Sequence, residues 1–189
     1  MRYPKDHKQQ ARQQLLNQSG SHAKKHGFSA SGVDALAGAA GVTSGSFYKH
    51  FASKNALFST LVKAELEQTI SRFATIKPGD REALLTALAT YLSLSHVHSP
   101  ENGCPVPSLA AEVGRGNGAV RMTFEAGMVD FKKVLGDITA SDDTAWTLIA
   151  QNVGAVMIAR AMCNDSVRQE VLDAVRTSGA QLLAGSPGA

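Results

Sequence analysis

Apolar residues recur at helical spacing along most of the chain, in segments separated by glycine, proline and short polar turns. The segments with this spacing are residues 8–26, 53–76, 84–98, 108–113, 119–135, 142–162 and 166–183. None of them alternates strictly between apolar and polar residues, which is the pattern typical of a half-buried strand. The sequence therefore predicts an all-α protein.

Residues 33–51 predict two short helices joined by a tight turn. Four apolar positions of the first helix fall at i, i+3, i+4 and i+7 and form one stripe: Val33, Leu36, Ala37 and Ala40. Gly41 follows as a helix-ending residue, and Thr43 is a suitable N-cap for the second helix. Phe47 and Phe51 lie four residues apart, so both can pack against the first helix. This is the sequence pattern of a helix-turn-helix, whose second helix enters the major groove of DNA.

Residues 41–51 have the sequence Gly-Val-Thr-Ser-Gly-Ser-Phe-Tyr-Lys-His-Phe. They are preceded by Gly27-Phe28 and Val33-Asp34-Ala35-Leu36-Ala37, and followed by Ser53-Lys54 and Leu57-Phe58. This combination resembles the DNA-binding signature of the TetR family of bacterial transcriptional regulators, and in particular its AcrR-like repressors. The resemblance implies an N-terminal three-helix domain containing the helix-turn-helix, followed by a C-terminal helical bundle for ligand binding and dimerisation.

The resemblance also implies which residues contact a double-stranded DNA operator. Tyr48, His50 and Lys54 are expected on phosphates, and Thr43, Ser44, Gly45, Ser46 and Lys49 nearest the bases. An alternative for Tyr48 is a partly buried core tyrosine. Small hydroxyls and a glycine discriminate bases poorly, so DNA shape and half-site spacing should contribute much of the specificity.

Positive charge is concentrated near the N-terminus. Residues 1–55 contain eight Lys or Arg and two acidic residues, a net charge of +6, whereas residues 56–189 have −3 and the whole chain +3. This asymmetry predicts a DNA-binding domain at 1–55, with a basic arm at 1–7, and a body at 56–189 that does not touch DNA. The resemblance implies that this body is the ligand-binding and dimerisation domain. The family usually has large apolar residues late in the first helix, where this chain has His22 and Ala23, so we expect weak anchoring of that helix.

The C-terminal bundle is expected to form a homodimer through its last two helices. Residues expected at this interface are Ile149, Val153, Val156, Met157 and Arg160 on one helix and Val167, Val171, Val175 and Leu182 on the other. A two-fold dimer would set two recognition helices about 34 Å apart, matching a palindromic operator. By resemblance, a small-molecule effector of unknown identity would tilt residues 53–76 and release the operator.

Candidate effector-binding residues are mostly aromatic or Met side chains: Tyr91, Phe124, Met128, Trp146 and Met157. Such side chains at helical spacing are often simple core, and core packing is the alternative here.

Cys104 is a further candidate, in the irregular segment 99–107 with its three prolines. Gly103-Cys104-Pro105 resembles a segment in one branch of the family, some of whose members sense electrophiles or oxidants through a thiol. A loop cysteine can be accessible, and His96 or His98 could lower its pKa. The alternative is an ordinary half-buried cysteine.

Signatures of catalysis are lacking, so we expect no catalytic residues: the sequence has no Gly-x-Ser-x-Gly elbow, glycine-rich phosphate loop or HExxH helix. No cofactor or metal is expected, although His22 with His26, and His96 with His98 and Cys104, are metal-ligating residue types. Two cysteines, and no apolar stretch of about 20 residues, favour a cytoplasmic protein without a membrane segment. A non-specific architectural DNA-binding protein and a helical-bundle enzyme are the alternatives, and repression or activation is left open.

Overall fold

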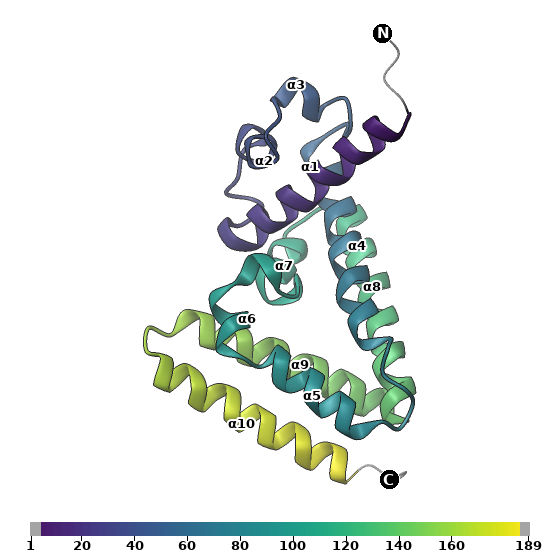
Figure 1. The fold of residues 1–189 in the computed structure, drawn as a ribbon, viewed down its shortest axis with the longest axis vertical. Coiled ribbons are helices and arrows are strands. Elements are labelled where there is room, and N and C mark those ends of the chain that lie inside the picture. The colour runs from purple at the N-terminus through teal and green to yellow at the C-terminus, as the bar shows by residue number, and fades with distance from the viewer. Residues whose placement is uncertain (1–4, 186–189) are drawn as a thin grey trace.

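The computed structural model describes residues 5–185, with side chains from residue 8 onward. This part of the chain is helical and contains no strand, so the all-α prediction is confirmed. Figure 1 shows a small N-terminal unit of three helices above a larger bundle. Residues 1–4 of the predicted basic arm lie outside the described residues, and Lys5–His7 belong to the first helix rather than to an arm.

The N-terminal unit consists of α1 (Lys5–His26), α2 (Val33–Ala39) and α3 (Ser44–Phe47). Apolar side chains from all three helices and from the segments that follow α1 and α3 are buried in its core: Leu15, Leu16, Phe28, Leu36, Ala37, Phe47 and Phe51. The ring of Phe28 stacks on Phe58 with the ring centroids 4.0 Å apart. Because Phe58 belongs to the helix that follows, that helix helps to close the unit.

The expected weak anchoring of α1 is wrong. Ser19 and Ala23 are fully buried, and Ser19 Oγ donates a hydrogen bond to the Leu36 carbonyl at 3.1 Å. A Cβ atom at Gly20 would lie 2.5 Å from the Glu65 carboxylate, so the missing side chain lets α1 approach its neighbour closely. Small residues therefore anchor α1 by letting it pack close to α2 and α4, although the sequence led us to expect that large apolar residues would be needed.

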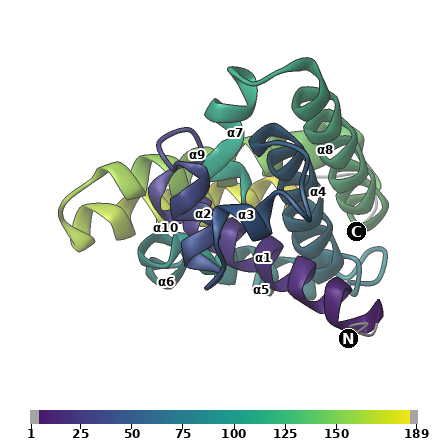
Figure 2. The same ribbon diagram turned by 90° about the horizontal axis from the view of Figure 1, so that it is seen from above.

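α4 (Lys54–Phe73) runs from the N-terminal unit into the bundle, where it packs along α8 (Gly118–Thr139). The two helices lie side by side in both views (Figure 1, Figure 2). Gly127 permits this approach, because a Cβ atom there would lie 2.6 Å from the Leu66 side chain. Ser53 caps α4 as predicted. The domain boundary at 55/56 falls inside the first turn of this continuous helix and stays a prediction.

The single helix predicted at 84–98 is broken into α5 (Arg81–Tyr91) and α6 (Leu94–His98). The break is at Leu92, whose ψ of 56° lies outside the helical range. Ser93 starts the new helix, because its hydroxyl accepts a backbone N–H hydrogen bond at 3.2 Å. The chain thereby turns toward the irregular segment that follows.

That segment is more regular than predicted. A 3-10 turn, η1 (Pro100–Asn102), is followed by α7 (Val106–Gly114). α9 (Asp142–Ala161) and α10 (Asp165–Ala184) then pack against each other and complete the bundle. Among the described helices, none combines the length and apolar character needed to cross a membrane.

The outer face of α9 and α10 has several exposed apolar side chains. Trp146 and Met157 are 42% and 43% exposed, and Ile158 and Val167 are also exposed. Ile149 and Val156, expected at the dimer interface, are instead buried within the chain itself. The interface prediction is wrong for these two, because their side of α9 faces the protein's own core. Arg160 is likewise bonded internally, with Nη1 donating to Ser108 Oγ at 2.8 Å.

Candidate nucleic-acid interface and ligand cavity

The turn between α2 and α3 has the geometry that the sequence predicts. Gly41 has a φ of +71°, in the left-handed region that glycine adopts without steric cost. The N–H of Val42 donates to the Ala37 carbonyl at 3.0 Å and closes the turn. Thr43 then caps α3, its Oγ1 accepting a hydrogen bond from the Ser46 N–H at 3.2 Å. These contacts fix the angle at which α3 leaves α2.

Two phenylalanines hold α3 against the core and leave its polar residues outside. Phe47 and Phe51 are buried, with their ring centroids 5.9 Å apart. Tyr48 is 57% exposed, and its ring lies edge-on to Phe47 at 5.2 Å. The structure therefore places Tyr48 at the surface and excludes the core alternative.

The eight residues predicted to contact DNA gather on and around α3, at the outer end of the N-terminal unit (Figure 1). Thr43, Gly45, Tyr48 and Lys49 are exposed, and Ser44, Ser46, His50 and Lys54 are partly buried. They lie close together in the chain, from the N-cap of α3 to the first residue of α4, and their contacts with DNA stay a prediction.

Two basic residues of α1, Lys8 and Arg12, lie near this surface and were missed by the sequence reasoning. Burial of the ring lowers the pKa of His50, and the positive charges of Lys8, Arg12 and Lys49 lower it further. The guanidinium of Arg12 lies 4.8 Å from the centroid of the Phe51 ring. The resulting positive field suits a phosphate backbone. The signal that could have found the pair is its spacing of four residues at the start of the first helix.

Lys54 is partly engaged within the protein. Its Nζ donates to the Ser29 carbonyl at 3.3 Å and lies 4.8 Å from the centroid of the Phe28 ring. An ammonium group has three N–H donors. Lys54 can therefore keep this contact and still donate to a phosphate.

A cavity of about 420 Å³ lies among α4, α5, α6 and the segment that ends at Cys104. Two of the six predicted ligand residues, Tyr91 and Cys104, line it. Phe73 adds an aromatic wall, while His96 and Arg72 add polar groups. A mostly apolar wall with a few polar groups is typical of a small-molecule site.

The other four predicted ligand residues are not among those that line this cavity. Met128 is buried, and Phe124 packs against the core from α8. Trp146 and Met157 lie exposed on α9. The cavity opens among α4 to α6 rather than between α8 and α9, and it gives these four residues no support as ligand contacts.

Cys104 is not the accessible, activated thiol that the sequence led us to expect. It is 3% exposed, and burial raises the pKa of its thiol. His96 does not face the sulfur as a base, because its Nε2 accepts a hydrogen bond from the Cys104 backbone N–H at 3.1 Å. A thiol reacts as the thiolate, so this environment makes Cys104 slow to modify.

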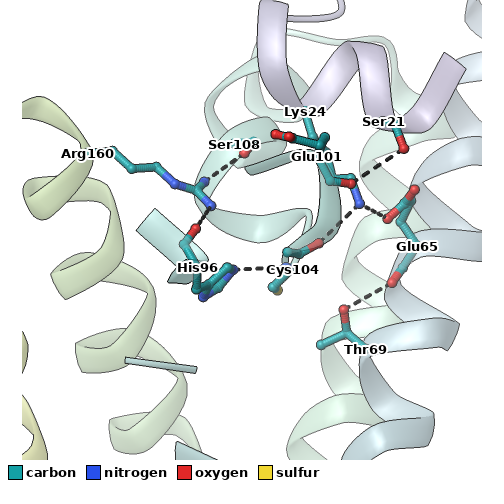
Figure 3. Close-up of polar contacts among 10 residues, drawn as sticks. Ser21, Lys24, Glu65, Thr69, His96, Glu101, Cys104, Ser108 and Arg160 are labelled. Carbon is teal, nitrogen blue, oxygen red and sulfur yellow. Dashed lines mark hydrogen bonds and ion pairs between the residues drawn. The ribbon is translucent and has the colours of Figure 1, made fainter. Parts of the chain in front are cut away.

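His96 has a defined tautomer. Its Nδ1 lies 2.7 Å from the Tyr91 carbonyl, which can only accept, so Nδ1 holds the proton and Nε2 is the acceptor for Cys104. Burial lowers the pKa of His96, and nearby cations lower it further against the opposing effect of the Tyr91 bond. The neutral ring thus ties the cavity wall to α6 (Figure 3).

In the part of the chain that the structure describes, no group of three or more His, Cys, Asp or Glu side chains is arranged to hold a metal ion. The rings of His22 and His26 have centroids 4.7 Å apart. His98 contacts Asp165, with Nε2 and Oδ1 3.1 Å apart.

Residues 22–61 match the model for bacterial regulatory proteins of the tetR family. No curated protein matches the chain.

Three solved structures show how widely the fold is shared. E. coli NemR in its reduced form has a TM-score of 0.80 at 21% identity, covering 95% of this chain and 100% of its own. A TetR transcriptional regulator from Chloroflexus aurantiacus has a TM-score of 0.78 at 21% identity, with coverages of 96% and 98%. FadR from Bacillus subtilis in complex with stearoyl-CoA has a TM-score of 0.68 at 17% identity, with coverages of 92% and 98%.

Identities this low show only a shared fold, whereas the family model matches the sequence itself, over residues 22–61. The matched residues include α2, the turn and α3, which are the elements of the helix-turn-helix. Residues 22–61, which contain the helix-turn-helix, therefore match the tetR family of bacterial regulatory proteins, and nearly the whole chain shares its fold with solved regulators such as the TetR protein from Chloroflexus aurantiacus.

Proposed function

We propose that the protein is a ligand-responsive transcriptional repressor that binds a palindromic operator as a homodimer and is released by a small molecule. The observation that supports this most directly is the course of α4. This helix begins beside the basic α3 surface and continues along the 420 Å³ cavity. One rigid element therefore joins a surface suited to DNA with a space suited to a ligand. Acting on DNA, the protein would work in the cytoplasm.

On the DNA side, we assign the bases to the start of α3 and the phosphates to its surroundings. Residues 43–46 and Lys49 would lie nearest the bases, with Tyr48, His50 and Lys54 on the phosphates. Lys8 and Arg12 extend the phosphate-binding group, because their charges act on His50 in the folded chain. The exposed N–H groups and dipole at the start of a helix also favour phosphate oxygens.

The exposed apolar face of α9 and α10 is the proposed dimer interface. Trp146, Met157 and Ile158 on α9 and Val167 on α10 are uncovered in the single chain. Exposed apolar side chains gathered on one face favour association, and a two-fold axis lets the same face serve both chains. The two copies of α3 would then read two half-sites about one helical turn apart.

The effector is proposed to occupy the cavity beside Tyr91, His96 and Cys104. An occupant that favours a tilted α4 would lower operator affinity, and the operator would lower effector affinity by the same factor. That B. subtilis FadR was crystallised with stearoyl-CoA supports a ligand site in this fold. An electrophile acting on Cys104 is the second route to release, and the burial of that thiol disfavours it.

In vitro selection of duplex DNA from a random pool tests the proposal, with binding of the selected duplex measured at several salt concentrations. A two-fold symmetric motif is the expected result. Lys54→Ala, which removes a proposed phosphate contact, should reduce the slope of log affinity against log salt by about one, whereas Lys133→Ala, on α8, should leave it unchanged. Salt-dependent binding without sequence preference would favour an architectural protein, and no binding at all would refute the DNA-binding proposal.

A further inference from the structure

Lys24 joins three parts of the molecule through one ammonium group. Its side chain is only 3% exposed although it belongs to α1, at the edge of the N-terminal unit. Nζ lies 2.5 Å from Glu65 Oε2 on α4, and it donates to the Gly103 carbonyl at 3.1 Å (Figure 3). Gly103 lines the cavity directly before Cys104. The DNA-binding unit, the connecting helix and the cavity wall therefore meet at this residue.

On the cavity side, the segment that Lys24 holds has little freedom. A Cβ atom at residue 103 would collide with the imidazole of His96, so only glycine allows this approach. The His96 ring also accepts a hydrogen bond from the Cys104 backbone N–H, and the His96 carbonyl accepts one from Nη2 of Arg160 at 3.0 Å. A molecule that enters the cavity and pushes this wall therefore moves the Gly103 carbonyl with it.

On the other side, α1 passes a displacement to the helix-turn-helix. One turn before Lys24, Gly20 lies against the same Glu65 carboxylate. Ser19 Oγ is bonded to the Leu36 carbonyl in α2. Ser21 Oγ donates from α1 to the Glu101 carbonyl in η1 at 3.5 Å. Through these contacts, a shift of the cavity wall reaches α2 without passing through the length of α4.

We propose that Lys24 is a positioning residue that couples occupation of the cavity to the orientation of the DNA-binding unit. Its bonds to Glu65 and to the Gly103 carbonyl set where α1 sits when the cavity is empty, and an occupant that displaces the wall shifts α1 through them. The inference deepens the proposed function, on which its biological meaning rests. A buried ion pair with a purely structural role would stabilise the fold but would not transmit a change in the cavity.

The test places a larger side chain in the cavity and measures hydrogen exchange in the DNA-binding unit, and it needs neither DNA nor an effector. Cys104→Met extends a side chain into the cavity as a defined occupant. This substitution is made in three backgrounds, and its effect on exchange is compared among them. The first is the native protein, the second is Lys24→Met/Glu65→Gln, which removes both charges together, and the third is Lys25→Met, the matched control. Lys25 is adjacent on α1, its side chain is 54% exposed, and its Nζ lies 3.9 Å from Glu101 Oε1. Lys25→Met therefore controls for the loss of a weak, solvent-exposed ion pair beside the same segment.

In the native and Lys25→Met backgrounds, Cys104→Met should change the exchange rates of amides 19–40 by about fivefold or more. In the Lys24→Met/Glu65→Gln background the change should fall below about twofold. If that double variant does not fold, Lys24→Gln replaces it, because its shorter side chain cannot reach both partners.

Equal changes in all backgrounds, or no change in the native one, would overturn the inference. Failure to recover an operator would refute the proposed function and leave this result standing on its own.

Discussion

Replacing Lys24 alone should destabilise the protein far more than replacing both members of its ion pair. The side chains of Lys24 and Glu65 are 3% and 12% exposed, so both charges lie almost out of water. Lys24→Met would leave the carboxylate without a cation and the Gly103 carbonyl without its 3.1 Å donor. Stranding one charge of a buried pair costs about 3–5 kcal/mol. Lys24→Met/Glu65→Gln leaves no stranded charge, and we expect it to cost about 1–2 kcal/mol.

Urea unfolding followed by circular dichroism measures both values. Protein concentration must be held constant, because the apparent stability of the proposed dimer would depend on it. With an m-value of about 3 kcal/mol/M, Lys24→Met should lower the midpoint by about 1–1.7 M. Lys25→Met, on the exposed side of α1, should stay within about 0.5 kcal/mol of the native protein.

The double-mutant cycle supplies the decisive comparison. Lys24→Met and Glu65→Gln each strand one partner, so their separate costs should exceed the cost of the double variant by about 2 kcal/mol or more. If the two costs simply add, Lys24 and Glu65 contribute independently. The account of α1 as anchored through this pair would then be wrong.

Three further predictions concern single sites. N-ethylmaleimide should modify the exposed Cys163 of the native protein well before the buried Cys104, as measured by mass spectrometry over time. Equal rates would contradict the raised pKa of the Cys104 thiol. Because the pKa of His96 is lowered in the folded state, the unfolded chain binds a proton first as pH falls through about 6.5, so stability should drop there and drop less in His96→Gln. Gly41→Ala, at a φ of +71°, should cost about 1–2 kcal/mol in urea unfolding, whereas Gly38→Ala, in open space within α2, should gain up to about 1 kcal/mol.

The helix-turn-helix could be predicted because its signals are local. Gly41, Thr43 and Ser53 each act on backbone groups within a few residues, and the structure has all three in the predicted roles. The break at Leu92 gave no such signal, because leucine and serine are both tolerated inside a helix. Only the contacts of the folded chain decide that α5 ends there.

The cavity could not be located from the sequence, because its walls come from elements far apart in the chain. Tyr91 and Cys104 were predicted, but Phe73 and Arg72 line the same space from the end of α4. Met128 and Trp146 have the same residue character and lie elsewhere. The residue type indicates which side chains are suited to line a cavity. The rotation of each helix about its axis, and its packing against its neighbours, decide which of those side chains reach the cavity.

The first helix shows how a local cost can have a distant compensation. Judged by propensity, Gly20 within α1 costs about 1 kcal/mol relative to alanine. In the fold it is the position at which α1 touches Glu65, and Lys24 one turn later bonds to the same carboxylate. The polar pair on α1 and α4 takes the place of the large apolar residues that the resemblance led us to expect.

That exchange changes how the DNA-binding unit responds to movement below it. An apolar contact is non-directional, so sliding it by a fraction of an ångström changes little free energy. A hydrogen bond depends steeply on distance and angle, so a modest shift of the cavity wall weakens the 3.1 Å bond from Lys24 to the Gly103 carbonyl unless α1 moves with the wall. An anchor of this kind holds α1 firmly in one arrangement and only weakly in arrangements that differ slightly from it. In the proposed dimer, the two copies of α3 would have to keep a set spacing on DNA, so such an anchor would give a sharp response. This is the physical reason to expect Lys24, rather than an apolar neighbour, to transmit the state of the cavity.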